Sequence, residues 1–189
     1  MSDLRPEFEE ALTLFARVSE ALEATGIPAP ILVGGAAVEL YTSSAIATGD
    51  FDVVSGQQDA VEAVLRSNGF IKPSGPGSMT RGWIHPELRL GLEIVGSSLL
   101  DGMADRHRVK LIRAETGHRF AVIAIEDLIA DRMGQYASGA APDMLQQAQT
   151  LFALAGTVDL AYMDRRIREE TNQEYGALDV QSRPRSDLP

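Results

Sequence analysis

The stretch ILVGGAAVELYTSSAIATGDFDVV, residues 31–54, decides the fold of this chain. It opens with Ile31–Val33, a short apolar run that predicts a buried strand. Gly34 and Gly35 follow at once, and glycine permits a tight turn that leaves backbone N–H groups uncovered. We expect a helix over roughly 36–41, with its positive end directed at whatever lies over the turn. This half of the stretch therefore predicts a strand, a Gly-Gly turn and a helix.

The same stretch ends in a second strand, DFDVV, which carries two carboxylates. Asp50 and Asp52 are two residues apart and point to one face, whereas Phe51 and Val53 point into the core. Aspartate is depleted in strands, and two carboxylates side by side repel each other. A hard cation such as Mg²⁺ between them would offset that repulsion. The pair predicts a metal site; the alternative is a solvated strand end without a cation.

The order of apolar strand, Gly-Gly, helix and acid–apolar–acid strand resembles the nucleotidyltransferase superfamily. VGGAAVEL and ATGDFDVV are most similar to small bacterial nucleotidyltransferase-like proteins, which include the toxin halves of some toxin–antitoxin pairs. The resemblance covers residues 31–54, and it extends to 85–95 and 124–150. It implies an α+β fold, with a small mixed sheet as a nucleotidyltransferase-like core, flanking helices and a C-terminal helical segment.

The family pattern has a third acid on a later strand, and Glu93 lies at the corresponding place in the chain order. Residues 88–95 predict a strand whose leucines and Ile94 share one face, while Gly91 and Glu93 lie on the other. We expect Glu93 to converge with Asp50 and Asp52 in one cleft as a catalytic, metal-binding carboxylate. The family acid is more often Asp. The alternative is an ordinary acid on the wet face of a strand.

The resemblance implies metal-assisted transfer of a nucleotide from a nucleoside triphosphate to an acceptor hydroxyl. Asp50, Asp52 and Glu93 would hold magnesium, with two ions expected. Gly34 and Gly35 would bind phosphate through backbone N–H groups; their alternative role is a plain structural turn. Phosphoryl-type transfer is mainly positioning and charge stabilisation, so few further groups are needed.

Two hydroxyl residues lie between the helix and the acid strand. Ser44 and Thr48 are candidate donors to nucleotide phosphate, and the alternative is that they cap or decorate a loop. Similar proteins often have a basic residue just before the acid strand, where this chain has Ile46. That departure removes one expected contact to a triphosphate.

Arg132 is a candidate phosphate ligand from the second half of the chain. It lies in AIEDLIADRMGQYASG, which resembles the helix that follows the sheet in the family. A basic residue there, usually Lys, can reach the nucleotide phosphates, and Arg would present a fork in place of a point charge. The alternative is a helix-surface arginine paired with Asp131 or Asp127.

Composition limits the classes of protein that this chain can belong to. It has 189 residues, no cysteine and a net charge of −10, which argues against disulfides, a cysteine metal site and general nucleic-acid binding. No apolar run approaches the length of a membrane span, and the acidic N-terminus does not read as a signal peptide. We expect a cytoplasmic protein that does not contact a membrane.

Periodicity predicts the remaining elements. We expect helices over 3–25, 59–68, a segment from 125, a segment from 140 and 158–174, and strands near 109–112 and 120–123. The locally basic segment 102–119 is interpreted as two edge strands with exposed arginines. The expected organisation is a nucleotidyltransferase-like core over 1–124, a helical segment over 125–175 and a flexible tail over 176–189.

Three functional hypotheses follow. The first is an active nucleotidyltransferase whose acceptor is an RNA end or a protein. The second is a catalytically inactive binding or regulatory module of the same fold, which the Ile46 and Glu93 departures and the acidic charge favour. The third is one component of a toxin–antitoxin pair, with a cognate antitoxin protein as partner.

Overall fold

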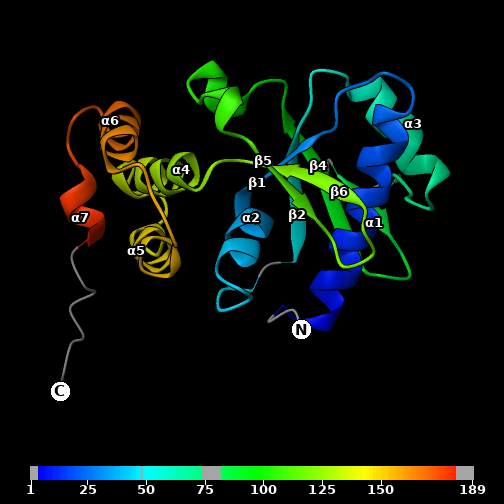
Figure 1. The fold of residues 1–189 in the computed structure, drawn as a ribbon, viewed down its shortest axis with the longest axis horizontal. Coiled ribbons are helices and arrows are strands. Elements are labelled where there is room, and N and C mark those ends of the chain that lie inside the picture. Colours follow the sequence, from blue (N-terminus) through cyan, green and yellow to red (C-terminus); the bar gives the residue numbers. More distant parts are fainter. Residues whose placement is uncertain (1–3, 48, 74–81, 182–189) are drawn as a thin grey trace. The chain divides into compact units, whose positions relative to one another are not determined.

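The computed structural model describes residues 4–47, 49–73 and 82–181. The chain divides into two compact units, Met1–Ile123 (unit 1) and Ala124–Pro189 (unit 2). Figure 1 shows the sheet and helices of unit 1 and the helices of unit 2. The helices and the mixed sheet make this an α+β protein, as the sequence predicts.

Unit 1 is built on a six-stranded sheet in the order β3-β4-β2-β1-β6-β5. Its strands are β1 (Ile31–Val33), β2 (Asp50–Val54), β3 (Trp83–His85), β4 (Leu90–Gly96), β5 (Lys110–Arg113) and β6 (Arg119–Val122). The acid strand β2 pairs antiparallel with β1 and parallel with β4. On its other side, β1 pairs parallel with β6. The strand that carries the acid pair therefore lies inside the sheet.

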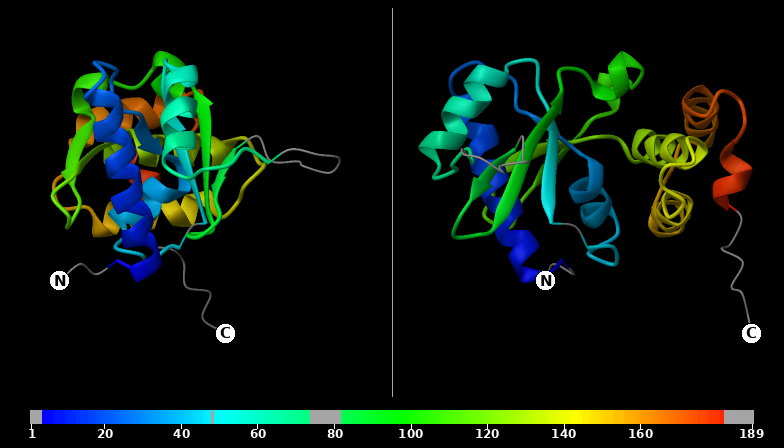
Figure 2. Two further views of the ribbon diagram at one scale, coloured as in Figure 1. Left: turned by 90° about the vertical axis from the view of Figure 1, so that its right-hand side faces the viewer. Right: turned by 180° about the vertical axis from the view of Figure 1, so that it is seen from behind.

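Helices α1 (Pro6–Glu23) and α2 (Gly34–Tyr41) cover opposite faces of the sheet. The ring of Phe51 on β2 lies 5.5 Å from that of Phe8 and 5.9 Å from that of Phe15, both on α1. The next residue, Asp52, lies against Gly34 at the start of α2. Successive strand residues point to opposite faces, so the acids share their face with α2. Helix α3 (Gln58–Ser67) lies beside α1 (Figure 2).

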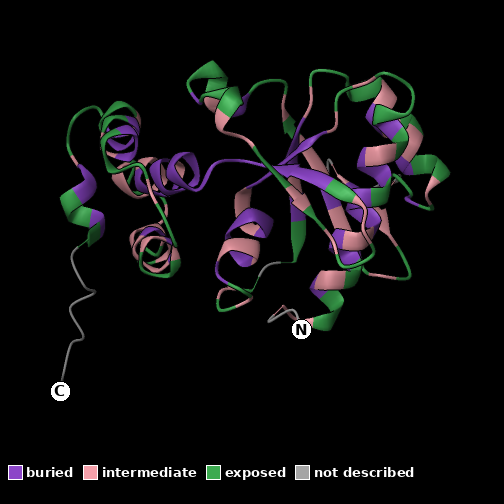
Figure 3. Cartoon of the chain, in the orientation of Figure 1, coloured by how far each residue is buried: buried purple, intermediate pink, exposed green. Residues whose placement is uncertain are grey.

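The apolar stripe of α1 forms the core on its side of the sheet. The residues predicted to face inward are all buried: Phe8, Leu12, Phe15, Val18 and Leu22. Full burial of such a side chain is worth about 1.5–3 kcal/mol, so this stripe is a large part of the stability of unit 1. Figure 3 shows buried residues concentrated along the inner side of α1 and on the central strands.

Unit 2 contains α4 (Ile125–Ala137), α5 (Met144–Leu154), α6 (Leu160–Glu170) and α7 (Ala177–Gln181). A buried arginine joins α4 to α6. Arg166, whose side chain is 1 % exposed, donates from Nε to Asp127 at 2.9 Å, and its other nitrogens pair with Glu169 and Glu170. The Tyr162 hydroxyl donates to the same Asp127 carboxylate at 2.9 Å. A buried charge that loses its partner is costly, so this network holds α4 and α6 together.

The first part of the predicted tail is helical. Ala177–Gln181 form α7, because Ala177 and Val180 are buried and the Gly176 N–H donates to the Asp179 carboxylate at 2.8 Å. The polar residues that follow this short segment concealed its two inward-facing residues. Residues 182–189, the rest of the predicted tail, lie outside the described residues.

The predicted strand over 88–95 also begins later, at Leu90, because residues 86–89 form the turn that joins β3 to β4. Its alternation holds from Leu90 to Glu93, since Leu90 and Leu92 are buried and Glu93 is half-buried. Ile94, predicted to lie on the buried face, is also half-buried, where the register between β2 and β4 shifts. Two short 3-10 helices, η1 (Leu99–Gly102) and η2 (Arg106–Arg108), connect β4 to β5. Within the parts of the chain that the structure describes, no helix has the length and apolar character required to cross a bilayer.

Candidate active site

The Gly-Gly turn and the acid strand meet at Gly34 and Asp52. Gly34 has φ +61°, a left-handed conformation that favours glycine. A Cβ on Gly34 would lie 3.0 Å from the Cβ and Cγ of Asp52, and closer still to its carboxylate oxygen. Asp52 is therefore placed directly at the N-terminus of α2, where negative charge is favoured. The positive φ and the contact with Asp52 both require glycine at position 34, whether or not a ligand binds there. Phosphate binding by Gly34 and Gly35 stays a prediction.

A second glycine makes room for the other aspartate. Asp50 is opposite Gly91 on the neighbouring strand β4, and a Cβ on Gly91 would lie 2.9 Å from the Cγ of Asp50. In the same register, Asp52 is opposite Glu93. The two parallel strands thus place Asp50, Asp52 and Glu93 on one face of the sheet. Asp50 is exposed, and the other two acids are half-buried.

The chemistry of this face suits a divalent cation. Asp50, Asp52 and Glu93 offer hard carboxylate oxygens, and Gly34 and Gly91 leave space for two of these side chains. Among the described residues, however, no three His, Cys, Asp or Glu side chains lie close enough together to form a metal-binding group. The acids fit magnesium by ligand type and by strand position. Their convergence on a shared ion stays a prediction.

Ser44 uses its hydroxyl within unit 1. The Oγ atom donates to Glu39 Oε1 at 2.9 Å and accepts from the Arg5 N–H at 3.0 Å. Its φ of +62° places it in the left-handed region, as does the φ of +48° at Ser43. These contacts are those expected for the loop alternative, and phosphate binding by Ser44 stays a prediction. Thr48, the other candidate hydroxyl, lies outside the described residues.

Arg132 lies in unit 2 on α4 and is 6 % exposed. Its guanidinium Nη2 is 3.6 Å from Asp131 Oδ2, and its Nη1 is 3.5 Å from Gln135 Oε1. Its Nε is buried without a hydrogen bond to any residue that the structure describes. The pairing with Asp131 is thus present, but on a buried arginine rather than a surface one, and Asp127 pairs with Arg166 instead. Phosphate binding by Arg132 stays a prediction.

Sequence reasoning missed the pair of Arg5 and Glu39. Glu39 on α2 is fully buried, and the Arg5 guanidinium binds it in two places, at 2.7 and 3.0 Å. The hydrogen bond to Glu39 raises the pKa of Arg5. The pair brings a cation to the loop that leads into the acid strand, close to the region where Ile46 replaced an expected basic residue. The available signal was the lone acid in the otherwise apolar run GGAAVELY.

No protein-family model matches this chain, and no curated protein matches it. The fold is similar to the solution structure of the antibiotic-resistance factor ANT(2'')-Ia, an aminoglycoside nucleotidyltransferase. The TM-score is 0.55 at 13 % sequence identity, and the match covers 87 % of this chain and 92 % of that chain. A likeness at this identity shows the fold alone, and it does not bear on the expected link to toxin–antitoxin pairs. The chain therefore has a nucleotidyltransferase-like α+β fold.

Proposed function

We propose that this protein is a metal-dependent nucleotidyltransferase that transfers a nucleotide from a nucleoside triphosphate to an acceptor hydroxyl. The observation that carries the proposal is the register of β2 and β4, which sets Asp52 opposite Glu93 and places Asp50 on the same face. Acidic residues are disfavoured in strands, and three of them lie here on adjacent inner strands, beside a glycine turn that opens a helix. Such departures from local preference are expected at functional sites.

Each candidate residue has a role in the proposal. Asp50, Asp52 and Glu93 would hold magnesium, with two ions expected. When bound, magnesium supplies positive charge for the phosphate oxygens. Gly34 and Gly35 would bind phosphate through their backbone N–H groups, and the fixed turn would orient it. Arg132 of unit 2 would add a cation for the phosphates. Ser44, whose hydroxyl also contacts Glu39 and the Arg5 N–H, would add a hydroxyl for the phosphates.

The net charge of the chain favours one class of acceptor over the others. The chain has a net charge of −10, which repels RNA and attracts cations. A hydroxyl-bearing amine is therefore favoured over an RNA end or an acidic protein, and the name of the ANT(2'')-Ia neighbour makes aminoglycosides the first class to test. RNA ends and proteins remain the comparison acceptors.

The test is a transfer assay with labelled nucleoside triphosphates, Mg²⁺ and three acceptor pools: aminoglycosides, small RNAs and proteins. We expect label in one pool together with release of pyrophosphate. Asp50→Asn should abolish labelling, because Asp50 is exposed and its carboxylate serves chemistry rather than packing. Asp59→Asn is the matched control, since Asp59 is an exposed aspartate on α3. Equal labelling by the Asp50 and Asp59 variants would remove the acid face from the mechanism.

A non-catalytic binding module is the second candidate. It is favoured by the lack of a three-residue metal group among the described residues and by the use of the Ser44 hydroxyl within the loop. Calorimetry with Mg²⁺ and nucleotide separates the candidates: binding without transfer to any acceptor supports the module. A cognate antitoxin is a proposal from the sequence resemblance, tested by co-purification of this chain with the product of a neighbouring gene.

A further inference from the structure

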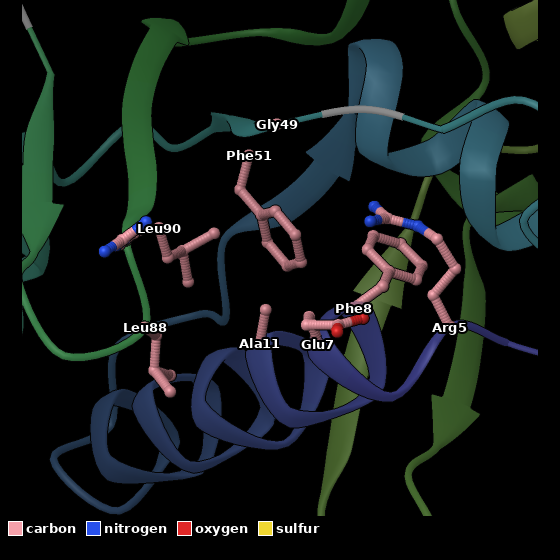
Figure 4. Close-up of a pocket in the computed structure, with 9 residues that line it drawn as sticks. Arg5, Glu7, Phe8, Ala11, Gly49, Phe51, Leu88 and Leu90 are labelled. Atoms are coloured by element: carbon pink, nitrogen blue, oxygen red, sulfur yellow. The ribbon is translucent and has the colours of Figure 1, made fainter.

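The two faces of strands β2 and β4 differ in how far they are covered. On one face, Phe51 and Leu90 point toward α1 and are buried, and the ring of Phe51 lies against that of Phe8 (Figure 4). On the other face, Gly91 is half-buried and Asp50 is exposed, although both strands lie inside the sheet. The face that carries the acids is therefore accessible on these two strands.

Two isoleucines continue this accessible face beyond β4. Ile84 on β3 is opposite Gly91, and Ile71 exchanges two backbone hydrogen bonds with Ile84, at 2.8 and 2.9 Å. Since Gly91 is opposite Asp50 in turn, one row of directly opposed residues runs from Ile71 to Asp50. Directly opposed residues point to the same face of a sheet, so Ile71 and Ile84 share the face of the acids. We call these two side chains the isoleucine ledge.

The chain neighbours of both isoleucines agree with this direction. Trp83, which precedes Ile84, is buried on the α3 side of the sheet. Lys72, which follows Ile71, reaches Glu62 of α3 at 3.0 Å. Because successive residues of an extended chain alternate in direction, Ile84 and Ile71 point away from α3. Ile71 is 56 % exposed and Ile84 is half-buried, so the ledge offers apolar surface to a ligand.

The Asp50 carboxylate leans toward the isoleucine ledge. Gly91 separates Asp50 from Ile84, and a Cβ on Gly91 would lie 2.9 Å from the Cγ of Asp50. The carboxylate thus occupies the space over Gly91, one strand away from Ile84. Apolar surface that ends at an acidic edge suits a ligand with an apolar face and a positively charged group.

The order of groups across the acid face indicates which substrate meets the ledge. The proposed phosphate site at Gly34 lies on the β1 side of the acids, beside Asp52, whereas the isoleucine ledge lies on the β4 side. In phosphoryl-type transfer the attacking and leaving oxygens are roughly in line, on opposite sides of the phosphorus. Pyrophosphate that leaves toward α2 therefore requires an acceptor hydroxyl that arrives from the ledge.

We propose that the isoleucine ledge selects the acceptor, and that this acceptor is a hydroxylated cyclic amine. Its apolar ring face packs on Ile71 and Ile84, and the negative charge of the acid face holds its ammonium group. Its hydroxyl oxygen bonds to the α-phosphorus, pyrophosphate leaves with the electron pair of the broken bond, and the hydroxyl proton passes to water. The order of substrates rests on the proposed nucleotidyl transfer, whereas the ledge can be tested by binding alone.

The first test is a titration of the full chain with trans-2-aminocyclohexanol, without nucleotide, followed by backbone amide NMR. We expect saturable shifts at the amides of Ile71, Ile84 and Gly91. Ethanolamine lacks the ring and cyclohexanol lacks the ammonium, so each should bind at least about fivefold more weakly than the probe.

A matched pair of variants locates the contact. Ile71→Thr keeps the branched shape that suits a strand and removes apolar surface, so it should bind the probe about fourfold more weakly or worse. Because Ile71 is exposed, the variant should melt at the temperature of the wild type. Leu111→Thr is the control: Leu111 is a strand residue that is 57 % exposed, but it lies on β5 at the opposite edge of the sheet.

Transfer kinetics separate this inference from the proposed function. With a hydroxylated cyclic amine as acceptor, Ile71→Thr should raise the KM of the acceptor about fourfold or more and leave kcat and the KM of the nucleoside triphosphate unchanged. Leu111→Thr should change none of these constants. An unchanged acceptor KM in Ile71→Thr would leave the proposed function intact and overturn the ledge. Shifts at the ledge without transfer to any acceptor would overturn the proposed function while supporting the ledge as an amine site.

The binding data alone can also refute the ledge. It is overturned if the probe gives no saturable shifts at the three amides, or if ethanolamine or cyclohexanol binds as tightly as the probe. It is equally overturned if Ile71→Thr binds the probe like the wild type.

Discussion

The carboxylate of Asp52 occupies the space that a side chain on Gly34 would need. The first glycine of the turn and the second acid of the strand are therefore one structural unit, although 18 positions separate residues 34 and 52 in the sequence. A side chain added at residue 34 would therefore displace the carboxylate of Asp52.

Gly34→Ala should destabilise the protein more than Gly26→Ala. Both glycines have positive φ, +61° and +80°, so each alanine incurs a left-handed cost of about 1–2 kcal/mol. Only Gly34 also faces Asp52, whereas a Cβ on Gly26 would meet nothing within 4 Å. Urea unfolding of the two variants measures the difference. Equal losses of unfolding free energy would mean that Asp52 moves away without cost.

Magnesium should stabilise the fold through the acid face. A ligand in ~100-fold excess over its Kd adds about 2.7 kcal/mol to the unfolding free energy. Asp52→Asn should lose much of this gain, because it removes one ligand charge, while the control Asp59→Asn should retain it. Thermal melting with and without Mg²⁺ measures both. The same melting shift in the Asp52 variant and in the wild type would count against a metal site.

Removal of Arg5 should destabilise unit 1 because it leaves the buried Glu39 without its cation. We expect a larger loss of unfolding free energy for Arg5→Ala than for Arg17→Ala, an exposed arginine on α1. Glu39→Gln in the Arg5→Ala background should recover part of the loss, since it neutralises the buried group. A double-mutant cycle tests this, and additive losses would show that the two residues do not interact energetically.

Stability should fall in acid through Glu20. A hydrogen bond to His118 and a second from the Arg119 N–H hold the pKa of Glu20 below its ordinary value of 4.5. A lowered carboxyl pKa stabilises the fold above 4.5, and this contribution is lost as the pH falls through the folded-state pKa. Glu20→Gln should therefore be less stable than the wild type at neutral pH and equal to it in strong acid.

Unfolding curves across pH test the Glu20 prediction. Glu23→Gln on the same helix is the control, because Glu23 is exposed. A constant difference between the Glu20 variant and the wild type at every pH would show that the loss comes from packing and not from charge.

Single helices and strands could be predicted because they follow from the spacing of apolar residues that are close in sequence. The 3-and-4 spacing of Phe8, Leu12 and Phe15 sufficed for α1, and alternation sufficed for the buried Leu92 beside the half-buried Glu93. The placement of Glu93 on a strand beside the acid pair came from the resemblance, since no local pattern states which strands pair. The β2–β4 pairing agrees with that expectation.

Long-range polar contacts could not be predicted. Arg5 and Glu39 are 34 residues apart, and their bond exists only after α1 and α2 have packed on opposite faces of the sheet. The same packing takes the Ser44 hydroxyl into this pair. The short helix α7 was missed for a related reason: it is held by the burial of Ala177 and Val180, and five residues are too few to show a helical period.

The pairing of β1 with β6 has a consequence for biosynthesis. Leu32 on β1 pairs with Val122 on β6, which lies 90 residues later in the chain. The central β1–β6 pairing therefore cannot form until β6 has left the ribosome. At ~5–20 residues per second, this wait lasts roughly 5–18 s. During that time β1 can pair only with the acid strand β2, and the edge of β1 that later pairs with β6 stays exposed. Contacts of such long sequence separation also slow refolding, so chaperone dependence of the nascent chain should be greatest before residue 122 is made.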